Sequence, residues 1–230
     1  KTKKTSNATQ FVKQYYPALL GNDHIVRNTV NLKKNWIITG PNASGKTTLL
    51  KTTAINVILT QQLGCGFYGD GSQMPRLYSH IHSYLNIPDT SERDSLFQAE
   101  ARRCKTIIDA VEHFAGDRHF CIFDELYSGT NPKEASKAAY AFLKYLSVRK
   151  NVDYILTTHY VDVCKRIADP TAELKRVGNY KMVVHGPPKM EKIEYTYKVK
   201  RGISSVLGAG HILKEMNYPK EIMGDFTKDI

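Results

Sequence analysis

The sequence contains a phosphate-binding pattern of the type GxxxxGK[ST], which runs from Gly40 to Thr47. An apolar run leads into its first glycine and helically spaced apolar residues follow it, which is the context that this motif requires. Glycines let backbone N–H groups curl around a phosphate, and the first turn of the following helix adds positive potential. We therefore expect Lys46 to neutralise the β- and γ-phosphates of a nucleotide, and Thr47 to place its hydroxyl on Mg²⁺. The expected nucleotide contacts are those of Gly40, Pro41, Asn42, Ala43, Ser44, Gly45, Lys46, Thr47 and Thr48.

Two adjacent carboxylates supply the groups that such a site needs for hydrolysis. The apolar run 120–123 leads directly into Asp124 and Glu125. We expect Asp124 to hold the Mg²⁺ shell and Glu125 to polarise the attacking water. The alternative is a salt-bridged acidic pair at the end of a strand. We also expect Asn42 and Lys46 to take part in catalysis, and the lysine to be exposed toward its ligand.

His159 follows a third apolar run, 154–158. If that run is a parallel strand, its C-terminal end is where ligands bind in open α/β sheets. The imidazole could then form a hydrogen bond with the γ-phosphate and report its presence. The alternative is a structural histidine whose hydrogen bonds are satisfied within the protein.

These groups need strands and helices to bring them together, and the apolar spacing predicts both. Buried strands separated by helices indicate parallel βαβ units. Buried strands are predicted at 36–39, 120–123 and 154–158, a further strand at 77–85 and an amphipathic strand at 193–199. Helices are predicted at 46–63, 95–115, 132–146, 204–216 and 219–226, and the Gly-rich stretch 64–76 is expected to be irregular.

Composition excludes several classes of protein. The chain has 230 residues, 41% hydrophobic and 24% charged, which fits one large α/β domain or one domain with a small appendage, and not a disordered protein. No apolar run approaches the ~20 residues that a membrane span needs, so no membrane partner is expected.

The net charge of +11 favours polyanionic partners, with simple solubility as the alternative. Four widely separated cysteines indicate neither a zinc site nor a disulfide framework, so we expect an intracellular, reducing compartment. The first residues lack a Met and an apolar core, which excludes a signal peptide and suggests a fragment of a longer chain.

Two weaker features have ordinary explanations. His80 and His82 would lie on one face of a strand as a metal-binding pair, but without a third ligand we favour surface or hydrogen-bonded histidines. The basic stretch 175–201 is interpreted as a solvated face, with weak contact to a phosphate backbone as the alternative.

A series of segments resembles, in family order, the motifs of the ATPase domain of the MutS mismatch-repair family within the ABC ATPase superfamily. The resemblance covers about 14–225 and is carried by 25–32, 39–42, 94–100, 128–131, 158–160 and 197–222. It implies an α/β fold of the P-loop ABC type, with a mixed or parallel sheet flanked by helices and a C-terminal helix-turn-helix appendage. The domains implied are a linker or frayed end at 1–12, an ATPase domain at 13–202 and a helical dimerisation segment at 203–230.

The resemblance also assigns roles outside the phosphate loop. Ile25 stands where the family has an aromatic residue or histidine that stacks on adenine, so it would give only an apolar contact. Ser95 and Glu100 fall on the two polar anchors of the family's signature segment. Ser95 also begins a helix, and one phosphate chain has little room for a second helix end from the same domain. We therefore expect Ser95 to face the γ-phosphate bound by a partner subunit, with capping of its own helix as the alternative.

The function implied is Mg²⁺-dependent ATP binding and hydrolysis by a dimerising domain that drives conformational switching in DNA mismatch repair or related DNA transactions. Its partners would be ATP and ADP, a second copy or a MutS-like heterodimer, and DNA contacted through domains mostly outside this chain. One alternative is an ATP-gated DNA clamp or recombination-type paralogue that does not recognise mismatches. Others are another ABC-type chromosome protein, such as an SMC-like head, and a small-molecule kinase with the same loop.

Overall fold

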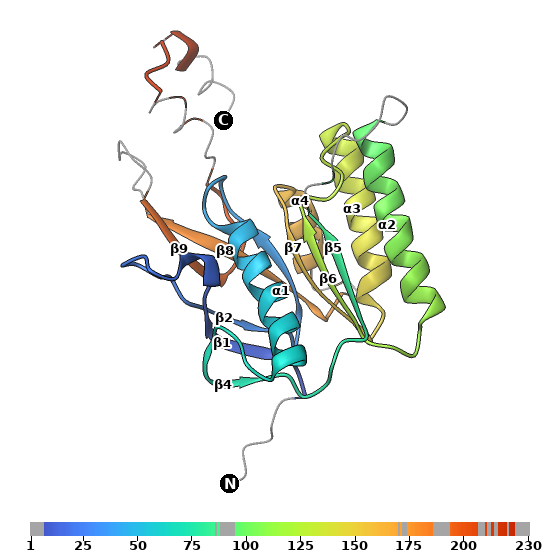
Figure 1. Cartoon of the computed structure of the whole chain (residues 1–230). Helices are drawn as coiled ribbons and strands as arrows, with labels where there is room; N and C mark the ends of the chain where they lie inside the picture. Colours follow the sequence, from blue (N-terminus) through green and yellow to red (C-terminus); the bar gives the residue numbers. More distant parts are fainter. Residues whose placement is uncertain are drawn as a thin grey trace.

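The computed structural model describes residues 7–85, 87, 95–169, 171, 174–185, 194–206, 210, 213, 216–219 and 221–223. A six-stranded sheet lies at the centre of these residues, in the order β5-β6-β7-β3-β8-β9. Its strands are β3 (Asn35–Thr39), β5 (His80–Tyr84), β6 (His119–Asp124), β7 (Val152–Thr157), β8 (Val177–His185) and β9 (Glu194–Arg201). Figure 1 shows helices on both faces of this sheet.

The sheet is mixed, because the pairing at one edge is antiparallel and the others are parallel. The pairings β5–β6, β6–β7, β7–β3 and β3–β8 are parallel, whereas β8–β9 is antiparallel. Parallel neighbours end at the same edge, so the C-terminal ends of β3, β6 and β7 lie together. The predicted α/β class and the flanked mixed sheet are therefore confirmed.

Helices cover the two faces of the sheet unequally. They are α1 (Lys46–Leu63), α2 (Leu96–His113), α3 (Pro132–Ser147) and α4 (Val161–Ala168), with a short 3₁₀ turn at Pro17–Leu19. Ile37 packs into the cluster formed with α2, α3 and α4, whereas its neighbour Ile38 packs into the cluster formed with α1. Both isoleucines are fully buried, because successive side chains of a strand point to opposite faces and both faces are covered.

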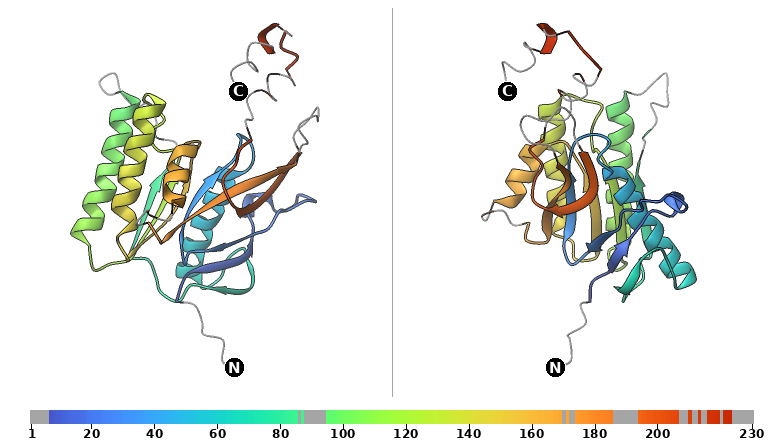
Figure 2. Two further views of the ribbon diagram at one scale, coloured as in Figure 1. Left: turned by 180° about the vertical axis from the view of Figure 1, so that it is seen from behind. Right: turned by 90° about the vertical axis from the view of Figure 1, so that its left-hand side faces the viewer.

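A second, antiparallel sheet packs beside α1 in the order β2-β1-β4 (Figure 2). Its strands are β1 (Gln10–Gln14), β2 (Asn28–Asn31) and β4 (Gly69–Gln73). The expectation that 64–76 is irregular is therefore wrong at β4, a strand without an apolar side chain. Phe11 in β1 is 1% exposed, so residues 10–12 of the stretch that was expected to be a linker up to residue 12 belong to this sheet. The carboxamide of the buried Asn56 accepts from the Phe67 backbone N–H (2.7 Å) and fixes the chain that leads into β4.

The predicted strands and helices of the main sheet are confirmed, with ends that differ by a few residues. The N-terminal end of α3 combines Pro132 at its first position with a cap from Asn131. The sequence patterns missed β1, β2, β8 and the short helix α4. The helices predicted at 204–216 and 219–226 lie about half outside the described residues; 210, 213 and 221–223 are helical, whereas 204–206 are not, so the predicted start of the first helix is wrong. In the part of the chain that the structure describes, no helix has the length and apolar character needed to cross a membrane.

A buried charge network closes the end of the sheet opposite the phosphate loop. Asp153 in β7 accepts hydrogen bonds from Arg118 (2.7 Å), Arg176 (3.1 Å) and the Tyr78 hydroxyl (2.9 Å). The Arg118 guanidinium also lies over the Tyr78 ring. A carboxylate with this many partners is stable in the interior, but its removal leaves two partly buried guanidinium groups without their acceptor.

Replacing Asp153 with Ala should therefore lower the free energy of unfolding by about 3 kcal/mol. Urea denaturation followed by the fluorescence of Trp36, the only tryptophan of the chain and itself buried, measures this directly. Asp109→Ala is the matched control, because Asp109 pairs with Lys105 on an exposed helix surface and should cost less than about 1 kcal/mol. Equal losses in the free energy of unfolding for the two variants would contradict the assignment of Asp153 as the shared acceptor of this network.

Candidate active site

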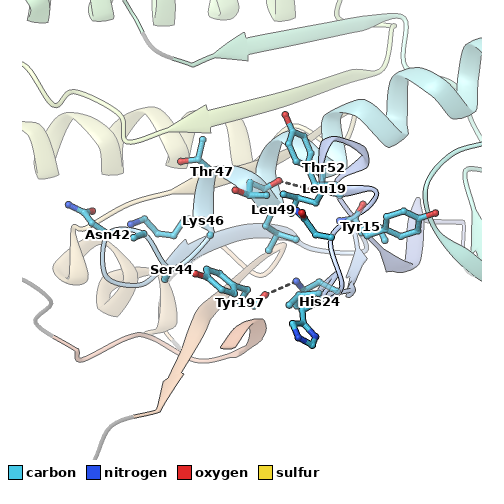
Figure 3. Close-up of a pocket in the computed structure, with 18 of the residues that line it drawn as sticks. Tyr15, Leu19, His24, Asn42, Ser44, Lys46, Thr47, Leu49, Thr52 and Tyr197 are labelled. Atoms are coloured by element: carbon cyan, nitrogen blue, oxygen red, sulfur yellow. Dashed lines mark hydrogen bonds between the residues drawn. The ribbon is translucent and has the colours of Figure 1, made fainter. Parts of the chain in front are cut away.

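The phosphate-binding loop joins β3 to α1 and lines one end of a cavity of about 580 Å³. Gly45 caps α1 with a φ of 91°, a left-handed conformation that glycine adopts without strain. The cavity is lined by loop and helix residues from Asn42 to Leu49, by Glu125, and by aromatic residues at its other end (Figure 3). Its volume suits a ligand of nucleotide size.

Lys46 is buried, at 5% exposure, which corrects the expectation of an exposed lysine. Its Nζ donates to the carbonyl oxygens of Gly40 (3.0 Å) and Pro41 (3.2 Å), and lies 3.7 Å from Glu125 Oε1. Burial lowers the pKa of Lys46, while the nearby charges of Glu125 and Asp124 raise it. The ammonium group therefore holds the loop in shape from within, so Gly40 and Pro41 contribute by accepting from it rather than by lining the cavity.

Thr47 and Asp124 meet at the start of α1. The Thr47 hydroxyl lies 2.9 Å from Asp124 Oδ2 and 3.2 Å from Oδ1, and Thr157 also donates to Oδ1. A hydroxyl and a carboxylate side by side are hard oxygen donors of the kind that Mg²⁺ takes from proteins, which usually give it only one or two carboxylates. Among the described residues, no group of three or more His, Cys, Asp or Glu side chains is placed to hold a metal ion.

Glu125 and His159 form the second polar pair of the site. His159 Nε2 lies 2.8 Å from Glu125 Oε1. Because a carboxylate can only accept, Nε2 carries the hydrogen, and its 3.3 Å approach to Lys46 is a contact rather than a second hydrogen bond. The hydrogen bond from His159 lowers the pKa of Glu125, burial opposes this, and the charges of His159 and Lys46 reinforce it. Glu125 also has a φ of 54°, in the left-handed region that non-glycine residues rarely adopt.

Glu100 lies within its own chain and not at an exposed anchor. It is 2% exposed and accepts from Ser128 N (2.9 Å), Ser128 Oγ (2.8 Å) and Gly129 N (3.1 Å). A Cβ at Gly129 would lie 2.8 Å from the backbone nitrogen of Phe97, so only glycine fits there. Glu100 and Gly129 thus join α2 to the turn that follows Glu125.

Ser95 caps α2, as the alternative interpretation predicted. Its Oγ accepts from Gln98 N (3.3 Å), and Gln98 Oε1 accepts from Ser95 N (2.8 Å), which completes a capping box. The hydroxyl hydrogen of Ser95 remains available to a further acceptor.

The far end of the cavity is aromatic, and the sequence patterns did not identify it. Tyr15, Tyr16 and His24 line it, whereas Tyr197 lines the cavity nearer the loop, beside Ser44 (Figure 3), and Ile25 does not line it. His24 and Val26 line the cavity on either side of Ile25, as expected for an extended segment whose side chains alternate. The apolar side chain that this segment gives to the cavity is that of Val26, and the contact of Ile25 with adenine stays a prediction.

The two weaker sequence features are resolved in part. His80 Nε2 lies 3.0 Å from Asp117 Oδ2, and His82 Nε2 lies 3.0 Å from His119 Nδ1, so both histidines are hydrogen-bonded as favoured. Burial lowers the pKa of His82 to about 4. In the described part of the basic stretch, Lys181 and Lys200 stand directly opposite each other on β8 and β9. Residues 186–193 of that stretch lie outside the described residues.

A family model for MutS domain V matches residues 36–228, which includes the loop, both carboxylates and His159. The chain belongs to the MutS family. It is 28% identical over 237 residues to the putative endonuclease MutS2 of Bacillus subtilis (strain 168), covering 100% of this chain and 28% of that protein. It is also 26% identical over 207 residues to the DNA mismatch repair protein MutS of Orientia tsutsugamushi (strain Ikeda), covering 87% of this chain and 22% of that protein. The endonuclease MutS2 of Caldicellulosiruptor saccharolyticus is 32% identical over 159 residues, covering 68% of this chain and 19% of that protein. The chain therefore spans at most 28% of the length of these MutS-family relatives.

Replacing His159 with Ala should raise the pKa of Glu125 toward the usual value near 4.3, because the hydrogen bond that favours the carboxylate is removed. A lowered pKa stabilises the fold above the unfolded-state value, and this stabilisation disappears as the pH falls through the folded-state value. The difference in the free energy of unfolding between the unsubstituted chain and His159→Ala should therefore shrink below about pH 4. Carboxyl ¹³C NMR titration measures the shift. His80→Ala, at the opposite end of the sheet, should leave the Glu125 titration unchanged.

Proposed function

We propose that this MutS-family chain is an ATPase domain that binds ATP together with Mg²⁺ and hydrolyses it to ADP and phosphate. The observation that carries the proposal is the meeting of three groups at one end of one cavity. Lys46 lies in the loop, Thr47 touches Asp124, and Glu125 accepts from His159. These are the cation, the metal ligands and the base that phosphoryl transfer to water requires.

Binding would begin with an exchange of partners by Lys46. Its ammonium group now donates to two loop carbonyls, and a phosphate chain that enters the loop offers charged acceptors instead. The backbone N–H groups at the start of α1 would bind the same phosphates, because the first turn of a helix leaves them unpaired. Asn42, Ala43 and Ser44 line the cavity on the approach to this turn.

Thr47 and Asp124 would hold Mg²⁺, since they place a hydroxyl and a carboxylate within 2.9 Å of each other. The ion, when bound, would neutralise phosphate charge. Glu125 would orient and deprotonate a water molecule, and His159 would fix the carboxylate through its hydrogen bond. The lowered pKa of Glu125 keeps it in the ionised form that a base needs at neutral pH.

The aromatic end of the cavity would receive the nucleoside. Tyr15 and Tyr16 line it there, and Tyr197 lines the wall between this end and the loop, so an aromatic side chain can meet the base, and base–aromatic stacking contributes roughly 1–3 kcal/mol per base. Arg27 lies over the Tyr15 ring at 5.2 Å and supports its position.

Replacing Glu125 with Gln should leave ATP binding intact and lower the rate of hydrolysis by about 10²-fold or more, the scale of a positioned acid–base group. Calorimetric binding and phosphate release measure the two effects separately. Glu134→Gln, an exposed acid in the first turn of α3, is the control and should hydrolyse ATP at the unsubstituted rate. ATP binding without hydrolysis in the unsubstituted chain would instead indicate an ATP-gated clamp.

At the level of the whole protein, we propose that this domain drives conformational switching in DNA mismatch repair or a related DNA transaction. The support is its family membership and the names of its relatives, which include a DNA mismatch repair protein. DNA would be contacted mostly through parts of the protein outside this chain. The working unit would be a dimer of two such domains, whether identical or MutS-like, joined in part by the segment 203–230.

In that dimer, Ser95 would act on the nucleotide of the partner subunit. Its hydroxyl hydrogen and the N-terminal end of α2 offer donors to an anion, and Glu100 holds this helix end against the turn after Glu125. Loss of the γ-phosphate would then remove a ligand that joins the two domains, which gives the switch a physical cause.

Mixing two inactive variants, Lys46→Ala and Ser95→Arg, tests this arrangement. If Ser95 acts across the interface, a mixed dimer has one site with both defects and one with neither, so part of the ATPase activity should return. Each variant alone is the control. Heterodimers that form, as shown by co-purification of differently tagged chains, and still hydrolyse no ATP would contradict the assignment.

A further inference from the structure

The outer edge of β9 is closed by a side chain and not by another strand. In an extended strand, the C=O of one residue and the N–H two residues later point to the same side. On this side, Asn28 Nδ2 donates to the Tyr197 carbonyl (2.9 Å), and Asn28 Oδ1 accepts from Val199 N–H (2.9 Å). A single carboxamide thus supplies both contacts that a neighbouring peptide group would make.

A second contact holds the same stretch from the other direction. Lys198, between the two bonded residues, donates from Nζ to the backbone carbonyl of Arg27 (2.9 Å). The segment 27–28 and the segment 197–199 are therefore bound reciprocally, side chain to backbone in both directions. This junction connects the small antiparallel sheet to the edge of the main sheet.

The residue held at this junction is strained. Between the pairings Met182↔Val199 and Val184↔Tyr195, β9 advances four residues while β8 advances two. Tyr197 lies at the apex of this bulge with a φ of 53°, a left-handed conformation that is unfavourable for a non-glycine residue. A strained conformation persists only where surrounding contacts fix it. Here the bonds to Asn28 are those contacts.

The strained conformation turns Tyr197 toward the phosphate-binding loop. A Cβ placed on Gly45 would lie 3.1 Å from Tyr197 Cδ1, so the ring lies against the loop at the start of α1. Tyr197 also lines the cavity (Figure 3), and the residue as a whole is 46% exposed. Asn28 lines the same cavity, on the side of the small sheet.

We propose that Asn28 is a positioning residue whose carboxamide holds Tyr197 over the cavity, and that it thereby sets how tightly the nucleoside part of the ligand binds. The inference rests on the proposed function, because it assumes that the cavity takes a nucleotide. It assigns Asn28 no direct contact with the reacting phosphates, which lie at the Lys46 end. Its effect passes through Tyr197.

The test compares ADP with pyrophosphate, which carries the same phosphates without the nucleoside. In the 230-residue chain, Asn28→Ala should weaken ADP binding about 10-fold, the scale of one base–aromatic contact, and pyrophosphate binding less than about 2-fold. Tyr197→Ala should do the same, and the double variant should lose little more than either single variant because the two residues act in series. Calorimetry measures ADP, and competition against ADP measures pyrophosphate.

Two further measurements separate positioning from a general structural role. Asn31→Ala removes a carboxamide from the same strand, one that bonds Gln10 and does not line the cavity, and should leave ADP affinity unchanged. Hydrogen exchange at the Val199 amide should accelerate in Asn28→Ala, while the fluorescence of Trp36 reports an intact fold.

The outcomes are distinguishable. Equal losses of ADP and pyrophosphate in Asn28→Ala would assign it to support of the loop and overturn the inference, and unchanged ADP affinity would overturn it as well. If the unsubstituted chain binds neither ligand, the proposed function fails first and the inference falls with it. Additive losses in the double variant would show that Asn28 does not act through Tyr197.

Discussion

The register of three parallel strands is the constraint on which the rest of the structure depends. Asp124 at the end of β6 lies opposite Thr157 at the end of β7, and Ile38 of β3 lies opposite the same Thr157. The ladder continues one step further, because Thr158 N donates to Ile38 O (3.0 Å) and Glu125 N donates to Thr157 O (3.1 Å). The loop, the carboxylates and His159 come from residues far apart in the sequence, yet backbone hydrogen bonds fix their relative height. A slip of one residue in any of these strands would separate them and turn buried side chains to the wrong face.

Around this edge, polar contacts take the place of regular secondary structure. Lys46 fills the phosphate loop from within, Thr47 and Thr157 both donate to Asp124, and His159 donates to Glu125. Every one of these groups would be costly to bury alone. Their mutual satisfaction explains how a cation and two carboxylates can be held within a few ångströms of one another and still leave one face open to a ligand.

Local patterns identified the parts of the fold that have strong local signals. Short apolar runs predicted β3, β6 and β7, and helical spacing predicted α1, α2 and α3, because both faces of the sheet are buried. The motif residues Asp124 and His159 could be placed because each follows such a run directly. By contrast, β4 has only Gly, Asp, Ser and Gln side chains and exists because β1 pairs with it, which no local pattern encodes. The aromatic lining of the cavity was missed for the same reason, since Tyr15 and Tyr197 come from different parts of the chain that meet only where the two sheets meet. The position of Lys46 depends in part on Glu125, and the inward direction of Glu100 depends on Ser128 and Gly129, all of them distant in the sequence.

Helix α2 and the turn after Glu125 are held at a fixed distance from each other. Glu100 prevents the helix from leaving the turn after Glu125, and the close approach of Gly129 to Phe97 prevents it from coming nearer, so the distance is limited by attraction and by steric exclusion at once. Cys104, Ile107 and Val111 pack the rest of α2 into the main core, so the turn and the helix form one body. With 18 residues, α2 is about 27 Å long, so this body reaches from the turn after Glu125 to His113 at the opposite end of the sheet.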